Sequence, residues 1–312
     1  MKRFAALFLS FLLLLTGCGS PVKETTPAST TAEPTISATV PTTVSTEPTP
    51  TEPAPTETTP AVLSPEPSDS DFVRIADYLP DIRFSLPYAT SENFTGQVIY
   101  DFTDPWLRYG TVKKLMAVYE ELSKQGLSLL IWDGFRPVSA QFTLWEVCPD
   151  PTYVANPETG YSSHSRGNTL DLTLTDQSGT PLEMPTGFDD FSKLADRDYS
   201  DCTETAAANA RLLQNVMETH GFSGYFGEWW HFSDTESYPV EETFTPVSPV
   251  WLYADCNEFI TLRTQPDTSA DAITRIPKNG EFQMLARSGD FAYVDYEGLQ
   301  GYVLLSYTQP VE

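Results

Sequence analysis

Histidine and cysteine are both scarce: the 312-residue chain has three of the first and four of the second. No two cysteines form a Cys-x-x-Cys pair, which excludes the common structural zinc site built from such pairs. None of them stands in a Cys/His pattern that indicates a nucleophile. Among Cys148, Cys202 and Cys256, the preferred disulfide pairs Cys148 with Cys202, and the thiol of Cys256 is then left over.

Basic residues are also few. Lys and Arg number 18 against 43 Asp and Glu, so the formal net charge is -25. Proteins that bind nucleic acid need Lys and Arg to neutralise phosphates, so the composition argues against a nucleic-acid partner. A small neutral or zwitterionic molecule, or a cell-wall polymer, is the better prediction for the partner.

Aromatic residues are absent from residues 19–70, a segment in which Thr and Pro dominate. Such a segment cannot bury enough apolar surface to offset the entropy lost on ordering. We therefore expect residues 19–70 to form a disordered linker that gives the rest of the chain reach.

A long apolar run is also missing, because the one at residues 4–15 is too short to span a membrane comfortably. Lys2 and Arg3 precede it, and Leu-Thr-Gly-Cys ends it at Cys18. This pattern predicts a signal peptide over residues 1–18. Its last four residues resemble a bacterial lipobox, which implies lipidation of Cys18 and an exported protein anchored to the outer face of the membrane. The alternative is a plain secretory signal with a chance cysteine.

The composition becomes globular from residue 71, and the pattern predicts an α+β domain over residues 71–247. Apolar spacing predicts helices at residues 111–125, 138–148 and 203–220, and strands at residues 127–133 and 169–174. Short strands or irregular structure are expected at the beginning of the domain. The stretch "YFGEWWHF" reads as a last strand or strand-like segment. These features predict a mixed or antiparallel sheet with flanking helices.

Residues 248–312 form short β-rich runs separated by turn pairs such as Asn279-Gly280, which predicts a small all-β barrel. The stretches "LRTQPDTSADAITRIPKNG" and "FAYVDYEGLQGYVLLSY" resemble the bacterial SH3-like domain. That resemblance implies targeting to the cell wall. A rigid spacer is the alternative role.

One of the three histidines, His164, lies in the Ser/Gly/Arg stretch "GYSSHSRGNTLDLTL", seven residues before Asp171. Strand alternation places the leucines of "TLDLTL" on one face and Asp171 on the other. A carboxylate is costly to bury there unless a cation meets it. His164 and Asp171 are therefore candidate metal ligands.

The third ligand must be His220 or His231. His220 ends a helix just before Gly221, where a cation interacts favourably with the helix dipole. This role explains a histidine at position 220 without a metal. His231 follows Glu228 by three residues in "GEWWHF". Two imidazoles and a carboxylate suit zinc with a fourth position left for water, and Glu228 can then act as general base.

The motif S-x-H-x-x-G-x-x-x-D, followed far downstream by E-x-W-H, resembles that of the VanX-type D-alanyl-D-alanine dipeptidases and carboxypeptidases. The matching residues here are Ser162, His164, Gly167, Asp171, Glu228, Trp230 and His231. The stretches "YATSENFTG", "DGFRP" and "FDDF" occur in the same order as in the family. The resemblance covers about residues 71–247, and Thr169 departs from the family by replacing a small residue.

The resemblance implies one catalytic zinc per chain held by His164, Asp171 and His231, with Glu228 as general base and acid. It also implies that Arg136 stabilises the developing oxyanion, whereas the residues alone suggest a turn arginine paired with Asp133. Three further residues are implied to bind or line the substrate site: Ser162, Asp189 and Tyr88.

The function so predicted is zinc-dependent hydrolysis of D-Ala-D-Ala, related to the peptidases of vancomycin resistance. One alternative is a D,D-carboxypeptidase that removes terminal D-Ala from peptidoglycan stem peptides, which an exported wall-binding enzyme would meet. The other, from a different class, is a wall-binding lipoprotein with an inactive site. The expected partners are the dipeptide or stem peptide, the cell wall through the SH3-like domain, and the membrane through the lipid anchor.

Overall fold

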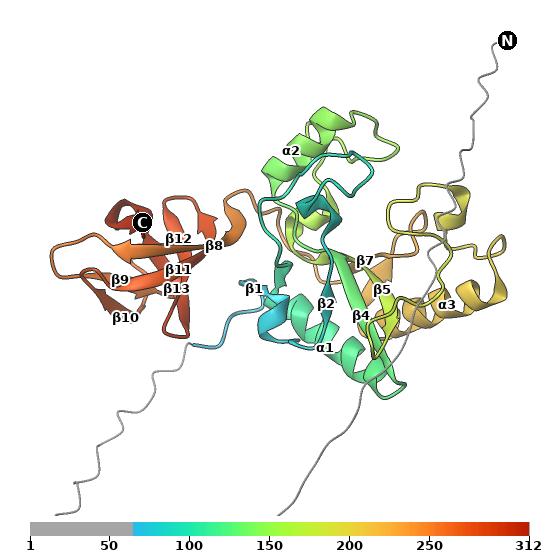
Figure 1. Ribbon diagram of the computed structural model, residues 1–312, viewed down its shortest axis with the longest axis horizontal. Coiled ribbons are helices and arrows are strands. Elements are labelled where there is room, and N and C mark those ends of the chain that lie inside the picture. Colours follow the sequence, from blue (N-terminus) through green and yellow to red (C-terminus); the bar gives the residue numbers. More distant parts are fainter. Residues whose placement is uncertain (1–64, 312) are drawn as a thin grey trace, which may run out of the picture. The chain divides into compact units, whose positions relative to one another are not determined.

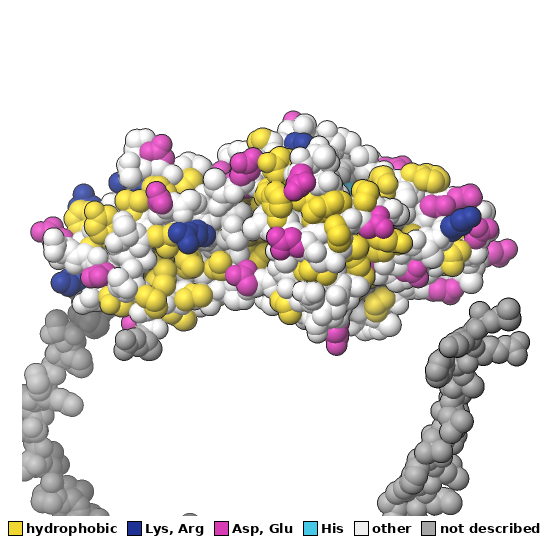
Figure 2. Space-filling view, turned by 90° about the horizontal axis from the view of Figure 1, so that it is seen from above, with side chains coloured by type: hydrophobic (Ala, Val, Ile, Leu, Met, Phe, Trp, Pro, Cys, Tyr) yellow, Lys and Arg dark blue, Asp and Glu magenta, His cyan; other side chains and the backbone are white. Residues whose placement is uncertain are grey.

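The structure is a computed structural model that describes residues 65–311. The predicted signal peptide, the lipidation site at Cys18 and almost all of the predicted linker lie outside the described residues. Within residues 65–311, no helix combines the length and the apolar character that crossing a membrane requires. Acidic side chains are spread over the face seen in Figure 2, with few Lys and Arg among them, in keeping with the composition.

A five-stranded mixed sheet forms the centre of the first domain (Figure 1). Its order is β2 (Arg83–Phe84), β4 (Leu127–Asp133), β5 (Thr169–Asp176), β7 (His231–Asp234) and β6 (Phe222–Gly224). β2 and β4 are parallel and the other pairs are antiparallel. The predicted α+β class is confirmed.

Two helices, α1 (Tyr109–Ser123) and α3 (Glu204–Thr219), pack on this sheet and on each other. Their apolar sides share one core with Leu129 and Ile131 of β4 and with the leucines of β5. A third helix, α2 (Val138–Val147), follows β4 after a short turn. The predicted helices are confirmed to within a few residues at their ends.

The central strand β5 is buried over Thr169–Thr175, on both of its faces. Leu170, Leu172 and Leu174 belong to the core under the helices. By strand alternation Asp171 lies on the opposite face, as predicted, and it is 4 % exposed. The sheet therefore presents a buried carboxylate on the face away from its main hydrophobic core.

The beginning of the domain is irregular, as expected, with a small antiparallel pair, β1 (Phe72–Arg74) and β3 (Trp106–Arg108). Between them lie two 3-10 helices, Ile75–Asp77 and Pro87–Ala89. Two further 3-10 turns occur later, at Ser163–Arg166 and Lys193–Ala195.

The last part of the chain is all β, as predicted. Its antiparallel sheet has the order β10-β9-β13-β12-β11-β8-β14. The strands are β8 (Phe244–Ala254), β9 (Phe259–Arg263), β10 (Ala272–Pro277), β11 (Glu281–Ser288), β12 (Phe291–Tyr296), β13 (Leu299–Leu304) and β14 (Thr308–Pro310), with a 3-10 turn at Leu305–Tyr307. Strand β8 runs across the expected domain boundary at residues 247/248.

Two expectations are corrected. Cys148, Cys202 and Cys256 are all free, so the preferred disulfide is wrong. The physical reason is that Cys148 and Cys202 pack against different hydrophobic clusters of the first domain. The stretch around Glu228 is a turn between β6 and β7, and its strand begins only at His231.

Candidate metal centre

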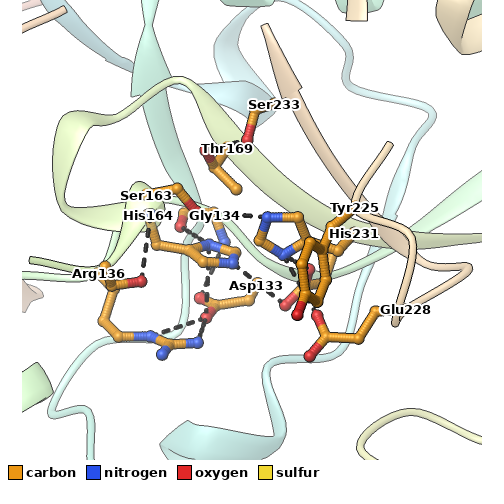
Figure 3. A network of polar contacts seen from close by, with 12 residues as sticks. Asp133, Gly134, Arg136, Ser163, His164, Thr169, Tyr225, Glu228, His231 and Ser233 are labelled. Carbon is orange, nitrogen blue, oxygen red and sulfur yellow. Dashed lines mark hydrogen bonds and ion pairs between the residues drawn. The ribbon is translucent and has the colours of Figure 1, made fainter. Parts of the chain in front are cut away.

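The register of the sheet brings the polar residues together. Asp171 of β5 is the Cα partner of Asp133 on β4 and of His231 on β7. Directly opposite residues of antiparallel strands project on the same face. Three neighbouring strands therefore direct two carboxylates and an imidazole to one place, and Figure 3 shows Asp133 and His231 there.

His164 reaches the same place from the 3-10 turn Ser163–Arg166 that precedes β5. The side chain of Ser162 caps this turn by accepting a hydrogen bond from the backbone N–H of His164 (3.3 Å). Gly167 ends the turn at φ 75°, a conformation that favours glycine. His164, Asp171 and His231 each offer one ligand atom, and these atoms lie within 4.8 Å of one another.

The tautomer of His164 follows from its surroundings. Its Nδ1 lies 2.8 Å from the carbonyl oxygen of Gly134, which can only accept, so Nδ1–H donates. The lone pair is then on Nε2, which faces Asp171 Oδ2 at 3.4 Å. A backbone carbonyl that fixes one ring nitrogen is the usual support of a metal-binding histidine.

His231 is held in a similar way. Its Nδ1 lies 3.1 Å from Asp171 Oδ1, while Nε2 lies 3.3 Å from the hydroxyl of Ser163. With Ser163 as the acceptor, Nε2 carries the proton and the Nδ1 lone pair faces the carboxylate. Sequence reasoning missed Ser163, whose part depends on tertiary contact with β7.

The donor set fits a cation. Among the described residues, Asp171 Oδ1 is buried without a hydrogen-bond donor. Burial alone would raise the pKa of Asp171, but the two histidines outweigh it and hold the pKa well below its usual range. Burial would likewise lower the pKa of His164, and the carboxylates of Asp171 and Asp133 raise it instead. A divalent cation would satisfy all three groups, and two imidazoles with one carboxylate suit zinc.

Glu228 lies beside the cluster, with Oε2 3.5 Å from His231 Nδ1 (Figure 3). It belongs to the β6–β7 turn, which the buried Trp229 and Trp230 fix in the core. Burial raises the pKa of Glu228, and the neighbouring charge of Asp171 raises it further. A carboxylate with a raised pKa is a better proton acceptor for work near neutral pH.

Arg136 is buried and has its donors fixed. Its guanidinium donates to Asp133 Oδ2 (2.6 Å from Nη2), to the Tyr100 hydroxyl (3.1 Å) and to Gln141 Oε1 (3.0 Å). Tyr100 also donates to Asp133, and Gln141 donates to the carbonyl oxygen of Ala155. The suggested pairing with Asp133 is thus present, and the same arginine also lines the cavity described below. Tyr100 and Gln141 were not found by sequence reasoning.

Asp189 and Tyr88 form a hydrogen-bonded pair in the lining of the same cavity. The Tyr88 hydroxyl donates to Asp189 Oδ2 at 2.8 Å. Asp189 adopts φ 53°, a left-handed conformation that is uncommon for residues other than glycine but that Asp tolerates better than most. Burial raises the pKa of Asp189 to about 8, and the charge of Asp171 contributes to the rise.

All the predicted site residues of this domain line one cavity of about 280 Å³. The predicted residues are Tyr88, Arg136, Ser162, His164, Asp171, Asp189, Glu228 and His231. Sequence reasoning missed other lining residues, among them Tyr153, Tyr161, Ser163, Phe191 and Tyr225. His220 is elsewhere, at the end of α3, where its Nε2 lies 2.7 Å from Glu121.

The family described as "D-ala-D-ala dipeptidase" matches residues 68–248, which is more than half of the chain. The chain therefore belongs to this metallopeptidase family and is an enzyme of that class. A second family, described as "Bacterial SH3 domain", matches residues 258–309. The predicted resemblance is confirmed for both domains.

Curated relatives of the chain are named for the same activity as the family. A D-alanyl-D-alanine dipeptidase of Escherichia coli (strain K12) is 37% identical over 173 residues, covering 55% of this chain and 89% of the relative. A D-alanyl-D-alanine dipeptidase of Enterococcus faecalis is 33% identical over 193 residues, covering 55% and 95%.

Solved structures include a mutant of the vancomycin resistance D,D-pentapeptidase VanY in complex with Zn(II), at 14% identity and a TM-score of 0.28. That match covers 42% of this chain and 74% of the other. The D,D-dipeptidase VanXYg in complex with a D-Ala-D-Ala phosphinate analog has 19% identity and a TM-score of 0.29, covering 43% and 52%.

The raised pKa of Asp189 predicts a pH-dependent stability. Between the ordinary value of 3.8 and about 8, the folded chain binds this proton more tightly than the unfolded chain. The contribution of Asp189 to the free energy of unfolding therefore falls as pH rises through that window. Asp189→Asn should remove this contribution, so the variant should gain stability relative to the unmodified chain between pH 5 and pH 8. Urea unfolding at pH 5 and at pH 8 measures the free energy of unfolding of both chains.

The matched control is Asp190→Asn, which changes the exposed neighbour. It should keep the pH dependence of the unmodified chain. If the free energy of unfolding changes with pH by the same amount in Asp189→Asn and in the unmodified chain, Asp189 is not protonated in the folded state.

Proposed function

We propose that this chain hydrolyses the dipeptide D-Ala-D-Ala in cell-wall peptide metabolism, with one zinc ion per chain. The observation that carries the proposal is the His164, Asp171 and His231 cluster, with Glu228 beside it in one cavity. Relatives named D-alanyl-D-alanine dipeptidase support the choice of substrate.

His164 through Nε2, His231 through Nδ1 and one oxygen of Asp171 would hold the zinc. When bound, the ion supplies Lewis acidity that makes water a nucleophile near neutral pH and polarises a carbonyl. The carbonyl of Gly134 fixes the tautomer of His164, and the hydroxyl of Ser163 can accept from Nε2–H of His231 in the tautomer that leaves Nδ1 free to bind.

Glu228 takes the proton from the attacking water, and its raised pKa helps it to do so near neutral pH. It then gives that proton to the leaving amine of the second D-alanine. Arg136 donates to the carbonyl oxygen as negative charge develops there. Its donors are already oriented by Asp133, Tyr100 and Gln141, so little reorganisation is needed.

Asp189 and Tyr88 would receive the ammonium group of the dipeptide, and Ser162 would contact a terminus. A substrate ammonium beside Asp189 offsets the cost of ionising this partly buried carboxyl group. The cavity of about 280 Å³ is slightly smaller than the usual range of ligand sites, about 300–1,000 Å³. Both features favour a dipeptide with a free amino group.

One observation favours the alternative of a D,D-carboxypeptidase acting on stem peptides. Three aromatic residues that line the cavity are well exposed, namely Tyr153 (45 %), Tyr161 (43 %) and Tyr225 (58 %). They offer a surface for a longer peptide. An inactive wall-binding protein is disfavoured, because the candidate ligands and Glu228 are all in place.

We also propose that the protein is an exported lipoprotein, anchored by Cys18 to the outer face of the membrane. Its parts would be the signal peptide (1–18), the linker (19–70), the peptidase domain (71–247) and the SH3-like domain (248–312). The basic and apolar start of the sequence with its Leu-Thr-Gly-Cys ending supports the anchor. The bacterial SH3 match supports contact with the cell wall.

Glu228→Gln tests the assignment of the base. It should lower the rate of D-Ala-D-Ala hydrolysis by about 100-fold or more, because the amide cannot accept the proton. Zinc content after chelation and refilling should stay at one per chain. Glu146→Gln, at an exposed position on α2, is the control and should keep full activity. Normal turnover by Glu228→Gln would show that another group is the base.

A comparison of substrates tests the proposed specificity. The zinc-loaded chain should release D-alanine from D-Ala-D-Ala much faster than from a stem pentapeptide ending in D-Ala-D-Ala, because the pentapeptide lacks a free amino group next to Asp189. N-acetyl-D-Ala-D-Ala is the matched control and should be cut as slowly as the pentapeptide. Faster release from the pentapeptide would instead identify a carboxypeptidase.

A further inference from the structure

Phe135 lies in the middle of the Gly134–Arg136 turn, which we call the catalytic turn. Gly134, on one side of it, orients His164, and Arg136 lies on the other side. It is 1 % exposed, and it packs into a cluster that contains residues of both domains. We call this the interdomain cluster. Its members are Phe72, Trp106, Phe135, Phe244, Leu285, Ala286, Phe291, Tyr293 and Tyr302.

The aromatic rings of this cluster form a continuous chain from the catalytic turn to the SH3-like barrel. Phe135 contacts Phe72 (centroids 4.4 Å apart), and Phe72 stacks on Phe244 at 4.5 Å. Trp106 lies 5.3 Å from Phe244 and 5.8 Å from Tyr293 of β12. Tyr293 in turn lies 5.0 Å from Tyr302 of β13. Such aromatic contacts stabilise beyond the burial of area alone.

Backbone contacts join the cluster to the catalytic turn. The N–H of Phe135 donates to the Trp106 carbonyl at 2.8 Å, and the N–H of Arg136 donates to the His164 carbonyl at 3.3 Å. The Trp106 carbonyl is so close that a Cβ on Gly134 would lie 2.9 Å from it. The position of Trp106 therefore sets where the Gly134 carbonyl meets His164.

The second catalytic turn rests on the same cluster. A Cβ on Gly167, which ends the turn that carries His164, would lie 2.4 Å from the ring of Phe72. The guanidinium of Arg108 lies 3.9 Å from the same ring and donates to the Arg166 carbonyl at 3.1 Å. Phe72 thus packs against both the Gly134–Arg136 turn and the His164 turn.

The two domains are also joined by the chain and by hydrogen bonds. Strand β8 begins at Phe244 in the cluster, where it pairs with Ser288 of β11, and continues into the barrel. Ser248 donates to the Asp101 carbonyl at 2.6 Å, and Gln265 donates to Asp71 at 3.1 Å. A spacer or an independent targeting module would need neither these hydrogen bonds between the domains nor the ring contacts that reach the catalytic turns.

We propose that the SH3-like domain positions the catalytic centre, with Tyr293 as the main positioning residue on its side. Tyr293 supports Trp106 and Phe244, and through them Phe72 and Phe135 hold the two turns that carry Gly134, Arg136 and His164. This inference rests on the proposed dipeptidase function. It assigns to the accessory domain a part in zinc binding and turnover that is separate from any contact with the wall.

A soluble dipeptide separates this role from targeting, because D-Ala-D-Ala needs no attachment to the wall. Tyr293→Ala in the full chain should lower kcat for the dipeptide by about 10-fold or more, since small displacements at supporting residues have effects of this size. Zinc affinity, measured by chelator competition with the metal-free chain, should fall as well. KM should change little, because Asp189 and Tyr88 lie outside the interdomain cluster.

Three matched variants define the comparison. Tyr293→Phe keeps the ring and should restore kcat and zinc affinity. Val294→Ala, the next residue on β12, opens the separate core of the barrel and should lower the unfolding temperature without changing kcat. Trp251→Ala removes an exposed ring on β8 and should leave kcat, zinc affinity and the unfolding temperature unchanged.

Phe135→Leu tests the same support from the other side of the cluster, should Tyr293→Ala fail to fold. It should show the same joint loss of kcat and zinc affinity. Unchanged kcat and zinc affinity in folded Tyr293→Ala, or losses of the same size in Val294→Ala, would overturn the proposal. If the unmodified chain leaves the dipeptide intact, the proposed function fails, and the zinc affinities still test the positioning role.

Discussion

The hydrogen bond from His164 Nδ1 to the carbonyl of Gly134 is the interaction on which the candidate centre depends. It fixes the tautomer, and it therefore decides that Nε2 faces Asp171 and a metal. It also joins the 3-10 turn before β5 to the turn after β4, which are otherwise far apart in the sequence. Arg136 belongs to the second of these turns, so one contact sets both the metal ligand and the group that would meet the oxyanion.

The register of the sheet places the other polar residues of the centre. Asp171 pairs with Asp133 and with His231, and a slip of one residue would send each side chain to the other face. The leucines of β5 oppose such a slip, because they are buried under α1 and α3. The free energy of the hydrophobic core thereby stabilises a cluster of polar groups that would be costly to bury on its own.

Much of this site could be predicted from the sequence, because strand alternation points to Asp171 and the motif points to His164, Asp171 and His231. Contacts made by backbone atoms and by tertiary neighbours could not, which is why Ser163, Tyr100 and Gln141 were missed. The turn around Glu228 read as a strand, since its aromatics suit a strand until their packing is known. The proposed disulfide failed for the same reason: cysteine spacing does not tell which cluster each thiol joins. Phe135 looked like part of a motif, and its partners in the SH3-like barrel have no local signal.

X-ray absorption at the zinc edge of the zinc-loaded chain tests the central claim most directly. We expect one zinc with two imidazole nitrogens at about 2.0–2.1 Å, a carboxylate oxygen at about 2.0–2.2 Å and a further light-atom ligand. Replacing His164 with Gln should remove one imidazole from the spectrum. A sulfur ligand at about 2.3 Å, or a chain that takes up no zinc, would contradict it.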